Sequence, residues 1–226
     1  KTDIKNQQVA GLVANLAPFT QGETSVLFNS NSPGIDLSEA LRKNQILYFQ
    51  LPTMMFPFLG EATGKLVLQT LQSAISQRHR FPESERQFFS CFLDDFQDYI
   101  YPGFASVVNK AASANVSVVF SHQALGDLDK VDPSFRNVVS TCTNIKVIMR
   151  TNDPDTREYF AKLIGTEKGE KTTERQQKGL LTTVKTGEGS VREVEQFIVH
   201  PTDINTLERG EGVLTLPHPR GVKVER

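Results

Sequence analysis

Four short apolar runs that alternate with helical segments constrain the fold of this chain more than any other feature of its sequence. The runs are QILYFQL (45–51), FFSCFL (88–93), NVSVVFS (115–121) and NIKVIMRT (144–151). Each has the length of a buried strand, and the segment from Phe58 to Gln77 carries apolar residues near helical spacing. Strands that alternate with helices need crossover connections. We therefore predict an α/β fold with a mostly parallel sheet and helices on both faces.

Local signals mark where further helices begin and end. Apolar residues recur at helical spacing from Val9 to Leu16. The segment GIDLSEALRKN (34–44) predicts a short helix with Asp36 or Ser38 as its N-cap. The segment DPDTREYFAKLIG (153–165) opens on Asp-Pro and closes on Gly165, which predicts the start and the end of another helix.

The C-terminal part has a different pattern, which predicts antiparallel additions to the sheet. Residues 179–199 contain two strand-like runs around Gly187-Glu188-Gly189, and residues 211–225 contain another pair around PHPRG. The segment GTEKGEKTTERQQKG (165–179) is charged and has no apolar period. We expect it to form a solvated loop, because it offers little apolar surface to bury.

The segment FLGEATGKLVLQT (58–70) looks like a phosphate-binding loop but does not satisfy its requirements. That loop needs four residues between its two glycines and a hydroxyl after the Gly-Lys pair, to cradle phosphates and hold Mg²⁺. Only three residues separate Gly60 from Gly64, and Leu66 stands at the hydroxyl position. We interpret the segment as the start of a helix.

Composition narrows the class of protein. The formal net charge of −1 over 226 residues gives no global attraction to nucleic acid or to a membrane surface. Cys91 and Cys142 are not in a C-x-x-C spacing, which indicates a reducing compartment. The sequence has no run of 18 consecutive apolar residues, which is the pattern of a membrane-spanning helix. Because the sequence begins inside a helical pattern, we expect it to be part of a longer protein.

The polar residues that follow two of the predicted strands are the candidate site. Asp94 and Asp95 follow the run 88–93, at the end where open α/β sheets bind ligands. In P-loop ATPases the first acid of such a pair holds Mg²⁺ through water, and the second orients or deprotonates the attacking water. The alternative is a turn capped by two aspartates. Gln123 follows the next strand, where RecA-like motors place a group that senses the γ-phosphate.

Together, the segments ILYFQLP, GKLVLQTL, FLDDF, FSHQALGDL and NIKVIMRTNDPDTREYFAKLIG resemble the C-terminal half of TraD/TraG-type coupling proteins. These are the hexameric ATPases of conjugative type IV secretion. The resemblance runs from about residue 19 to about residue 213. It implies that residues 1–33 are the tail of an inserted all-α domain and that 34–226 are the C-terminal part of a RecA-like motor domain. The phosphate-binding Walker A loop of the family lies upstream and is absent from this chain.

The resemblance also implies cofactors and roles. ATP and Mg²⁺ are the expected cofactors of the complete protein, with Asp94 on the nucleotide and on Mg²⁺ through water. Asp95 and Gln123 are the expected catalytic residues, and Gln123 also contacts the nucleotide. The family usually has Asp-Glu, so the carboxylate of Asp95 lies about one methylene farther from the γ-phosphate. Lys110 stands where many members have a trans-acting arginine, and Arg150 is the alternative nucleotide-binding cation.

The function implied by the resemblance is coupling of ATP hydrolysis to delivery of relaxase–DNA or protein substrates into a type IV secretion channel. The expected partners are DNA, the relaxosome or protein cargo, and channel components. A homo-hexamer at the cytoplasmic face of the bacterial inner membrane is the expected state of the complete protein. Two alternatives stay open: a catalytically silent RecA-like docking or assembly module, and a DNA translocase of the FtsK/HerA type.

Overall fold

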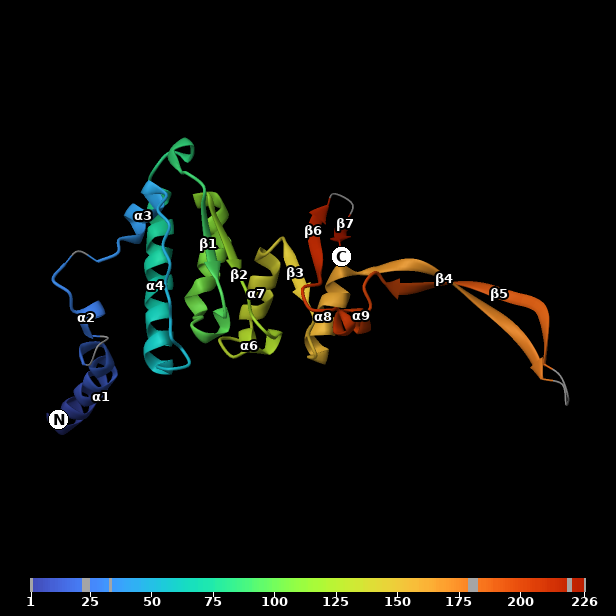
Figure 1. Cartoon of the computed structure of the whole chain (residues 1–226), viewed down its shortest axis with the longest axis horizontal. Coiled ribbons are helices and arrows are strands. Elements are labelled where there is room, and N and C mark those ends of the chain that lie inside the picture. Colours follow the sequence, from blue (N-terminus) through green and yellow to red (C-terminus); the bar gives the residue numbers. More distant parts are fainter. Residues whose placement is uncertain (1, 22–24, 33, 179–182, 219–220, 226) are drawn as a thin grey trace. The chain divides into compact units, whose positions relative to one another are not determined.

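The computed structural model describes residues 2–21, 25–32, 34–178, 183–218 and 221–225. The chain divides into two compact units. The first comprises residues 1–122 and 127–142, and the second comprises 123–126 and 143–226 (Figure 1). Among the described helices, none is long and apolar enough to cross a membrane. The boundary expected between residues 33 and 34 stays a prediction.

Most helices belong to the first unit. Asp36 caps one of them, since its carboxylate accepts hydrogen bonds from the amides of Ser38 and Glu39 at 2.8 and 3.2 Å. The predicted N-cap is thereby confirmed as Asp36. The helices are α1 (Thr2–Thr20), α2 (Ser25–Phe28), α3 (Leu37–Lys43), α4 (Pro57–Arg78), α5 (Ala105–Ala111) and α7 (Phe135–Cys142), with 3₁₀ turns η1 (Glu83–Glu85), η2 (Phe96–Asp98), η3 (Pro102–Phe104) and η4 (Ala112–Ala114).

Helix α4 contains the segment that looked like a phosphate-binding loop. Gly64 is buried in the interior of this helix, where a Cβ atom would lie 2.5 Å from Cβ and 2.7 Å from Cγ of Tyr99. Glycine is needed there because only a hydrogen atom fits between the helix and the tyrosine ring. The helical interpretation of the segment is confirmed.

Strands β1 (Phe89–Leu93) and β2 (Val116–Phe120) pair in parallel, with Leu93 opposite Phe120. Helix α5 lies in the connection between them, as a parallel crossover requires. Both strands therefore end at the same edge of the pair. The residues that follow them, Asp94 and Ser121, are brought side by side.

An aromatic cluster forms the core beside this strand pair. Phe96 and Phe104 are fully buried, with ring centroids 4.8 Å apart, and Phe120 lies 5.1 Å from Phe96. On the other face of the pair, Phe92 and Val119 remain exposed. The described helices of the first unit thus bury one face of β1 and β2.

Residues 45–51 do not form the predicted strand. Ile46 is 98% exposed and Tyr48 is 86% exposed, and none of the described strands pairs with this segment. The apolar run indicates a strand only where a neighbouring strand supplies backbone hydrogen bonds and a second layer covers the side chains. Neither is provided here by the described residues, so the prediction is wrong for this structure.

The second unit is built on an antiparallel sheet in the order β3-β6-β7. Its core consists of Ile148, Ile164, Val199, Ile204 and Val213. The predicted hairpin at the C-terminus and the predicted helix after Asp153 are confirmed. The elements are β3 (Lys146–Met149), α8 (Pro154–Ile164), α9 (Pro201–Thr206), β6 (Gly212–His218) and β7 (Gly221–Glu225). Helix α6 (Leu125–Asp129) begins in this unit and ends in the first.

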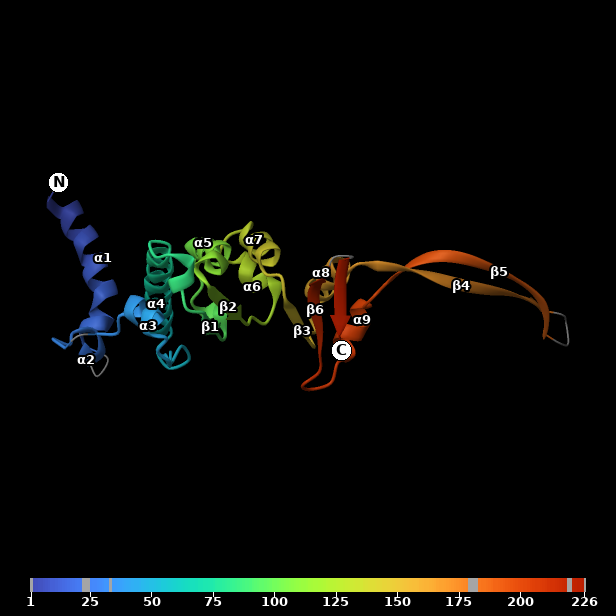
Figure 2. The ribbon, with the colours of Figure 1, turned by 90° about the horizontal axis from the view of Figure 1, so that it is seen from above.

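A long antiparallel hairpin of β4 (Thr166–Lys178) and β5 (Thr183–Phe197) also belongs to the second unit (Figure 2). It corrects two predictions, because the expected loop 165–179 forms β4 and the expected turn Gly187-Glu188-Gly189 lies within β5. The connection falls on 179–182, outside the described residues. Hydrogen bonds between backbones do not depend on apolar alternation, so the charged composition of β4 gave no strand signal.

Candidate functional site

Asp94 is held in place by the neighbouring strand end. Its Oδ1 accepts a hydrogen bond from the hydroxyl of Ser121 at 2.6 Å and another from the amide of Asp95 at 3.1 Å. The turn is fixed to β2 by two backbone bonds of 3.0 Å, from the amide of Ser121 to the carbonyl of Leu93 and from the amide of Phe96 to the carbonyl of Ser121. The orientation of this carboxylate is thus set by the pairing of β1 with β2.

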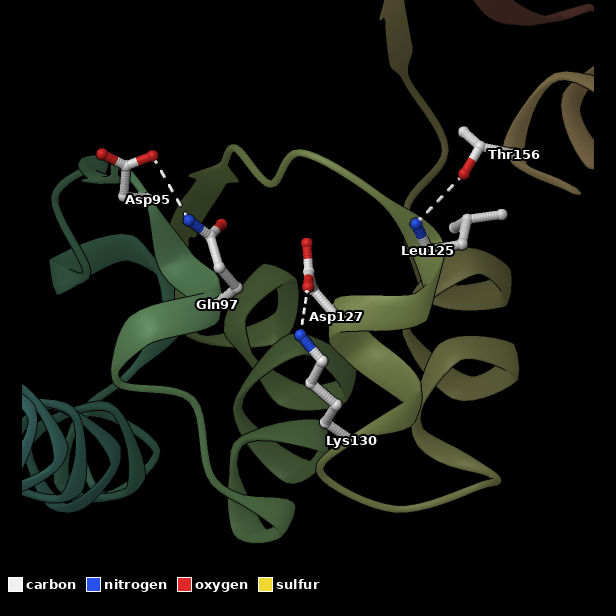
Figure 3. Close-up of polar contacts among 6 residues, drawn as sticks. All are labelled: Asp95, Gln97, Leu125, Asp127, Lys130 and Thr156. Carbon is white, nitrogen blue, oxygen red and sulfur yellow. Dashed lines mark hydrogen bonds and ion pairs between the residues drawn. The ribbon is translucent and has the colours of Figure 1, made fainter. Parts of the chain in front are cut away.

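Asp95 occupies a left-handed backbone conformation, with φ 45° and ψ 44°. Aspartate tolerates this region better than most residues because its short side chain bonds locally. Its Oδ1 accepts a hydrogen bond from Nε2 of Gln97 at 3.3 Å, and Figure 3 shows the two side chains facing each other. The two acids therefore have different partners although they are adjacent in the chain.

Tyr99 supports the same turn from inside the unit. Its hydroxyl donates to the backbone carbonyl of Asp94 at 2.7 Å. The pKa of Tyr99 is raised to about 12, chiefly by burial and also by Cys91 and the nearby carboxylates of Asp94, Asp95 and Asp98. The tyrosine therefore stays protonated, as its role as hydrogen-bond donor requires.

The other two predicted site residues belong to the second unit. Gln123 and Arg150 are exposed, the first in the loop after β2 and the second directly after β3. The loop that carries Gln123 ends at Leu125, whose amide donates to the hydroxyl of Thr156 at 3.2 Å (Figure 3). The structure thus brings Asp94 and Asp95 together with Ser121, and places Gln123 beside an anchor on α8.

Ser121 and Tyr99 are contributors that the sequence analysis missed. The signal for Ser121 was present, since it is the first residue after β2 and the strand ends meet at one edge. No local pattern marks Tyr99, because its contact with the carbonyl of Asp94 depends on the conformation of the intervening turn η2.

Metal binding at this site rests on the chemistry of a single carboxylate. Within the described part of the chain, no group of three or more His, Cys, Asp or Glu side chains is arranged to hold a metal ion. Asp94 has one oxygen fixed by hydrogen bonds, while its Oδ2 accepts none from the described residues. This arrangement fits Mg²⁺, which keeps several of its waters and uses one or two carboxylates.

A family model described as the TraM recognition site of TraD and TraG matches residues 89–209, more than half of the chain. The chain belongs to this TraD/TraG family. The matched region begins at β1 and ends beyond α9. It therefore includes Asp94, Asp95, Gln123 and Arg150, although the match itself assigns no role to them.

Individual relatives agree with membership in the TraD/TraG family. The type 4 coupling protein DotL of Legionella pneumophila subsp. pneumophila (strain Philadelphia 1) is 25% identical over 154 residues, covering 62% of this chain and 20% of DotL. The bacterial conjugative coupling protein TrwBdeltaN70, in its unbound monoclinic form, has a TM-score of 0.55 at 17% identity, covering 84% of this chain and 38% of that chain. TrwB in complex with ADP and Mg²⁺ has a TM-score of 0.55 at 16% identity, covering 90% and 42%.

The chain spans about a fifth of the length of DotL and less than half of these TrwB chains. The likeness to TrwB shows the fold and confirms the predicted α/β class with antiparallel C-terminal strands. Among the described strands only β1 and β2 pair in parallel, and β3, which we predicted within the parallel sheet, pairs antiparallel with β6.

Proposed function

We propose that this chain supplies one side of the ATP site in a TraD/TraG-type motor that delivers DNA or protein substrates to a type IV secretion channel. The single observation that carries the proposal is the turn at Asp94, held at the carboxyl edge of a parallel strand pair. Family membership supports the same reading. The phosphate-binding loop comes from elsewhere in the complete protein, because the look-alike segment lies inside α4.

Asp94 is the proposed metal-side acid. Its fixed Oδ1 and open Oδ2 suit a Mg²⁺ ion that is bound through water. When bound there, the ion would offset negative charge on the nucleotide phosphates. Ser121 contributes by orienting the carboxylate of Asp94. The TrwB structure solved with ADP and Mg²⁺ supports a nucleotide and Mg²⁺ as the molecules bound.

Asp95, Gln123 and Arg150 are the other residues proposed to act on the nucleotide. Asp95 would accept a proton from, or orient, the attacking water, and Gln97 donates a hydrogen bond to its carboxylate. Gln123 would contact the γ-phosphate, and Arg150 would reach the nucleotide of a neighbouring subunit in the proposed homo-hexamer. Because Asp95 is shorter than the usual glutamate, we expect slow hydrolysis.

The proposed partners follow from the family. The matching family is described as the TraM recognition site, and DotL is named a type 4 coupling protein. We propose that the complete protein contacts a relaxosome or protein cargo and channel components at the cytoplasmic face of the inner membrane. The family match covers the hairpin β4–β5 as well as β1 and β2.

The test is ATP hydrolysis by the complete parent protein, measured as phosphate release. Asp94→Ala should lower kcat by roughly 100-fold or more and Gln123→Ala by roughly 10-fold, because both act on charge that develops in the transition state. Asp127→Asn is the matched control, since Asp127 pairs with the largely exposed Lys130 at 2.8 Å and surface pairs contribute little (Figure 3). Unchanged rates for both Asp94→Ala and Gln123→Ala would refute the proposal.

The same experiment decides the alternative of a catalytically silent docking module. Asp95 in place of the family's usual glutamate and Lys110 in place of its usual arginine favour this alternative. A silent module predicts no hydrolysis that depends on Asp94, together with retained binding of the secretion partners. Loss of hydrolysis in the Asp94 variant would exclude it.

A further inference from the structure

Thr156 lies at a junction of hydrogen bonds that no step of the proposed mechanism uses. It is in the first turn of α8 and is 4% exposed. Its amide donates to Oδ2 of Asp153 at 3.0 Å, and its hydroxyl donates to the same oxygen. These bonds lower the pKa of Asp153 below its ordinary value, so the carboxylate stays ionised as an acceptor.

The direction of the hydroxyl group follows from these contacts. Because its hydrogen is committed to Asp153, the oxygen of Thr156 is available only as an acceptor. The amide of Leu125 donates to it at 3.2 Å, across 31 residues of sequence. Leu125 is 2% exposed and begins α6, where an amide has no partner within its own helix. Thr156 is therefore the acceptor that this buried amide needs.

The anchored amide limits the freedom of the loop that carries Gln123. Leu125 is two residues beyond Gln123, and two residues span at most about 7 Å. At the other end of the loop, the amide of Ser121 is bonded to the carbonyl of Leu93 at 3.0 Å. Each end of the loop is thus held within its own unit. The exposed Gln123 lies between these two anchored backbone amides.

We propose that Thr156 is a positioning residue for Gln123: its hydroxyl fixes the start of α6 to the N-terminus of α8 and so orders the loop that carries Gln123. This inference rests on the proposed function, because it assumes that Gln123 acts on the nucleotide. The same network includes Thr151, whose hydroxyl accepts from the amide of Asp153 at 3.2 Å in the loop after β3. The order of the loop that carries Gln123 and the order of the loop after β3 are therefore linked through Asp153.

The first test uses the chain as it is and does not require activity. Thr156→Val removes the hydroxyl with little change of shape, and Thr156→Ser retains it. Hydrogen exchange followed by mass spectrometry should show at least about tenfold faster exchange over residues 122–126 in the valine variant. The serine variant should restore the slow exchange. Equal exchange in wild type and Thr156→Val would overturn the inference.

The matched control is Thr215→Val in the same unit. Thr215 is 2% exposed and its hydroxyl donates to the carbonyl of Lys146 at 3.4 Å, so it is also a buried, bonded threonine. It is on β6 and has no bond to the loop. The control should leave exchange over 122–126 unchanged. If Thr215→Val accelerates exchange there as much as Thr156→Val does, the effect is general loss of stability and the inference fails.

The second test measures hydrolysis by the complete protein in two backgrounds. Thr156→Val should lower kcat by roughly tenfold with KM changed less than about twofold, because loss of position affects the transition state most. In a Gln123→Ala background the same change should have no further effect. An equal loss in both backgrounds would overturn the inference while the proposed function stands. If Gln123→Ala alone leaves kcat unchanged, the proposed function fails and this inference fails with it.

Discussion

Replacing Gly64 with alanine should destabilise the first unit, although alanine is the better helix former. Gly64 lies in the interior of α4, where alanine is favoured over glycine by about 1 kcal/mol. The new Cβ atom would lie 2.5 Å from Cβ of Tyr99 and 3.1 Å from Cδ1 of Leu51. Carbon atoms pack best at about 3.5–4.0 Å, so helix and tyrosine must separate by about 1 Å.

Tyr99 has little room to move away. It is 8% exposed, its ring lies edge-on to Phe96, and its hydroxyl donates to the carbonyl of Asp94. Overpacking typically costs about 1–3 kcal/mol, and loss of the hydrogen bond adds about 1 kcal/mol. After subtraction of the helix propensity, we expect a net loss of about 1–3 kcal/mol in the free energy of unfolding.

Urea denaturation followed by circular dichroism measures this difference directly. The matched control is Gly126→Ala, because Gly126 is exposed in α6 and a Cβ there would meet no atom within 4 Å. The control should leave stability unchanged or raise it by up to about 1 kcal/mol. If Gly64→Ala is as stable as the wild type or more stable, the close packing of Tyr99 on α4 is refuted.

Further predictions concern the same turn. Tyr99→Phe should lower the free energy of unfolding by about 1–2 kcal/mol in denaturant titrations, because the carbonyl of Asp94 loses its donor, whereas Tyr48→Phe, at an 86% exposed position, should not. Because the pKa of Tyr99 is raised to about 12 in the folded state, the wild type should lose stability between about pH 10 and 12, and Tyr99→Phe should lose less. Burial raises the pKa of Cys91 to about 11, so its alkylation by iodoacetamide at pH 8, read by mass spectrometry, should be at least about 100-fold slower in the folded chain than in urea; equal rates would contradict this. In the complete protein Asp95→Glu should raise kcat several-fold, and an unchanged or lower kcat would contradict the proposal that the short side chain slows hydrolysis. This chain alone should release no phosphate above background, and release by it would contradict the proposal that its site is incomplete.

Several elements could be predicted because their signals are local. Asp36 caps α3 and Asp153 caps α8, since a carboxylate reaches amides only two or three residues away. The acids after β1 were predicted to stand at a sheet edge, and the parallel pairing with β2 confirms that placement. Their roles in nucleotide chemistry stay predictions.

The failures share one cause, which is dependence on a partner segment. Residues 45–51 have the pattern of a strand but no described strand beside them, and β4 has no such pattern yet pairs along its length with β5. Strand formation requires hydrogen bonds from another part of the chain, and a single apolar run does not say whether that part is present.

By itself the sequence determined helix ends such as Asp36 and Asp153 and the positions of the acids after β1, because these depend on neighbours within a few residues. Only the tertiary structure decided that Gly64 makes room for Tyr99, that Ser121 orients Asp94, and that Thr156 holds Leu125. Each of these contacts joins two residues that are 27 to 35 positions apart in the chain. Their geometry follows from packing and strand register, which the order of residues does not display.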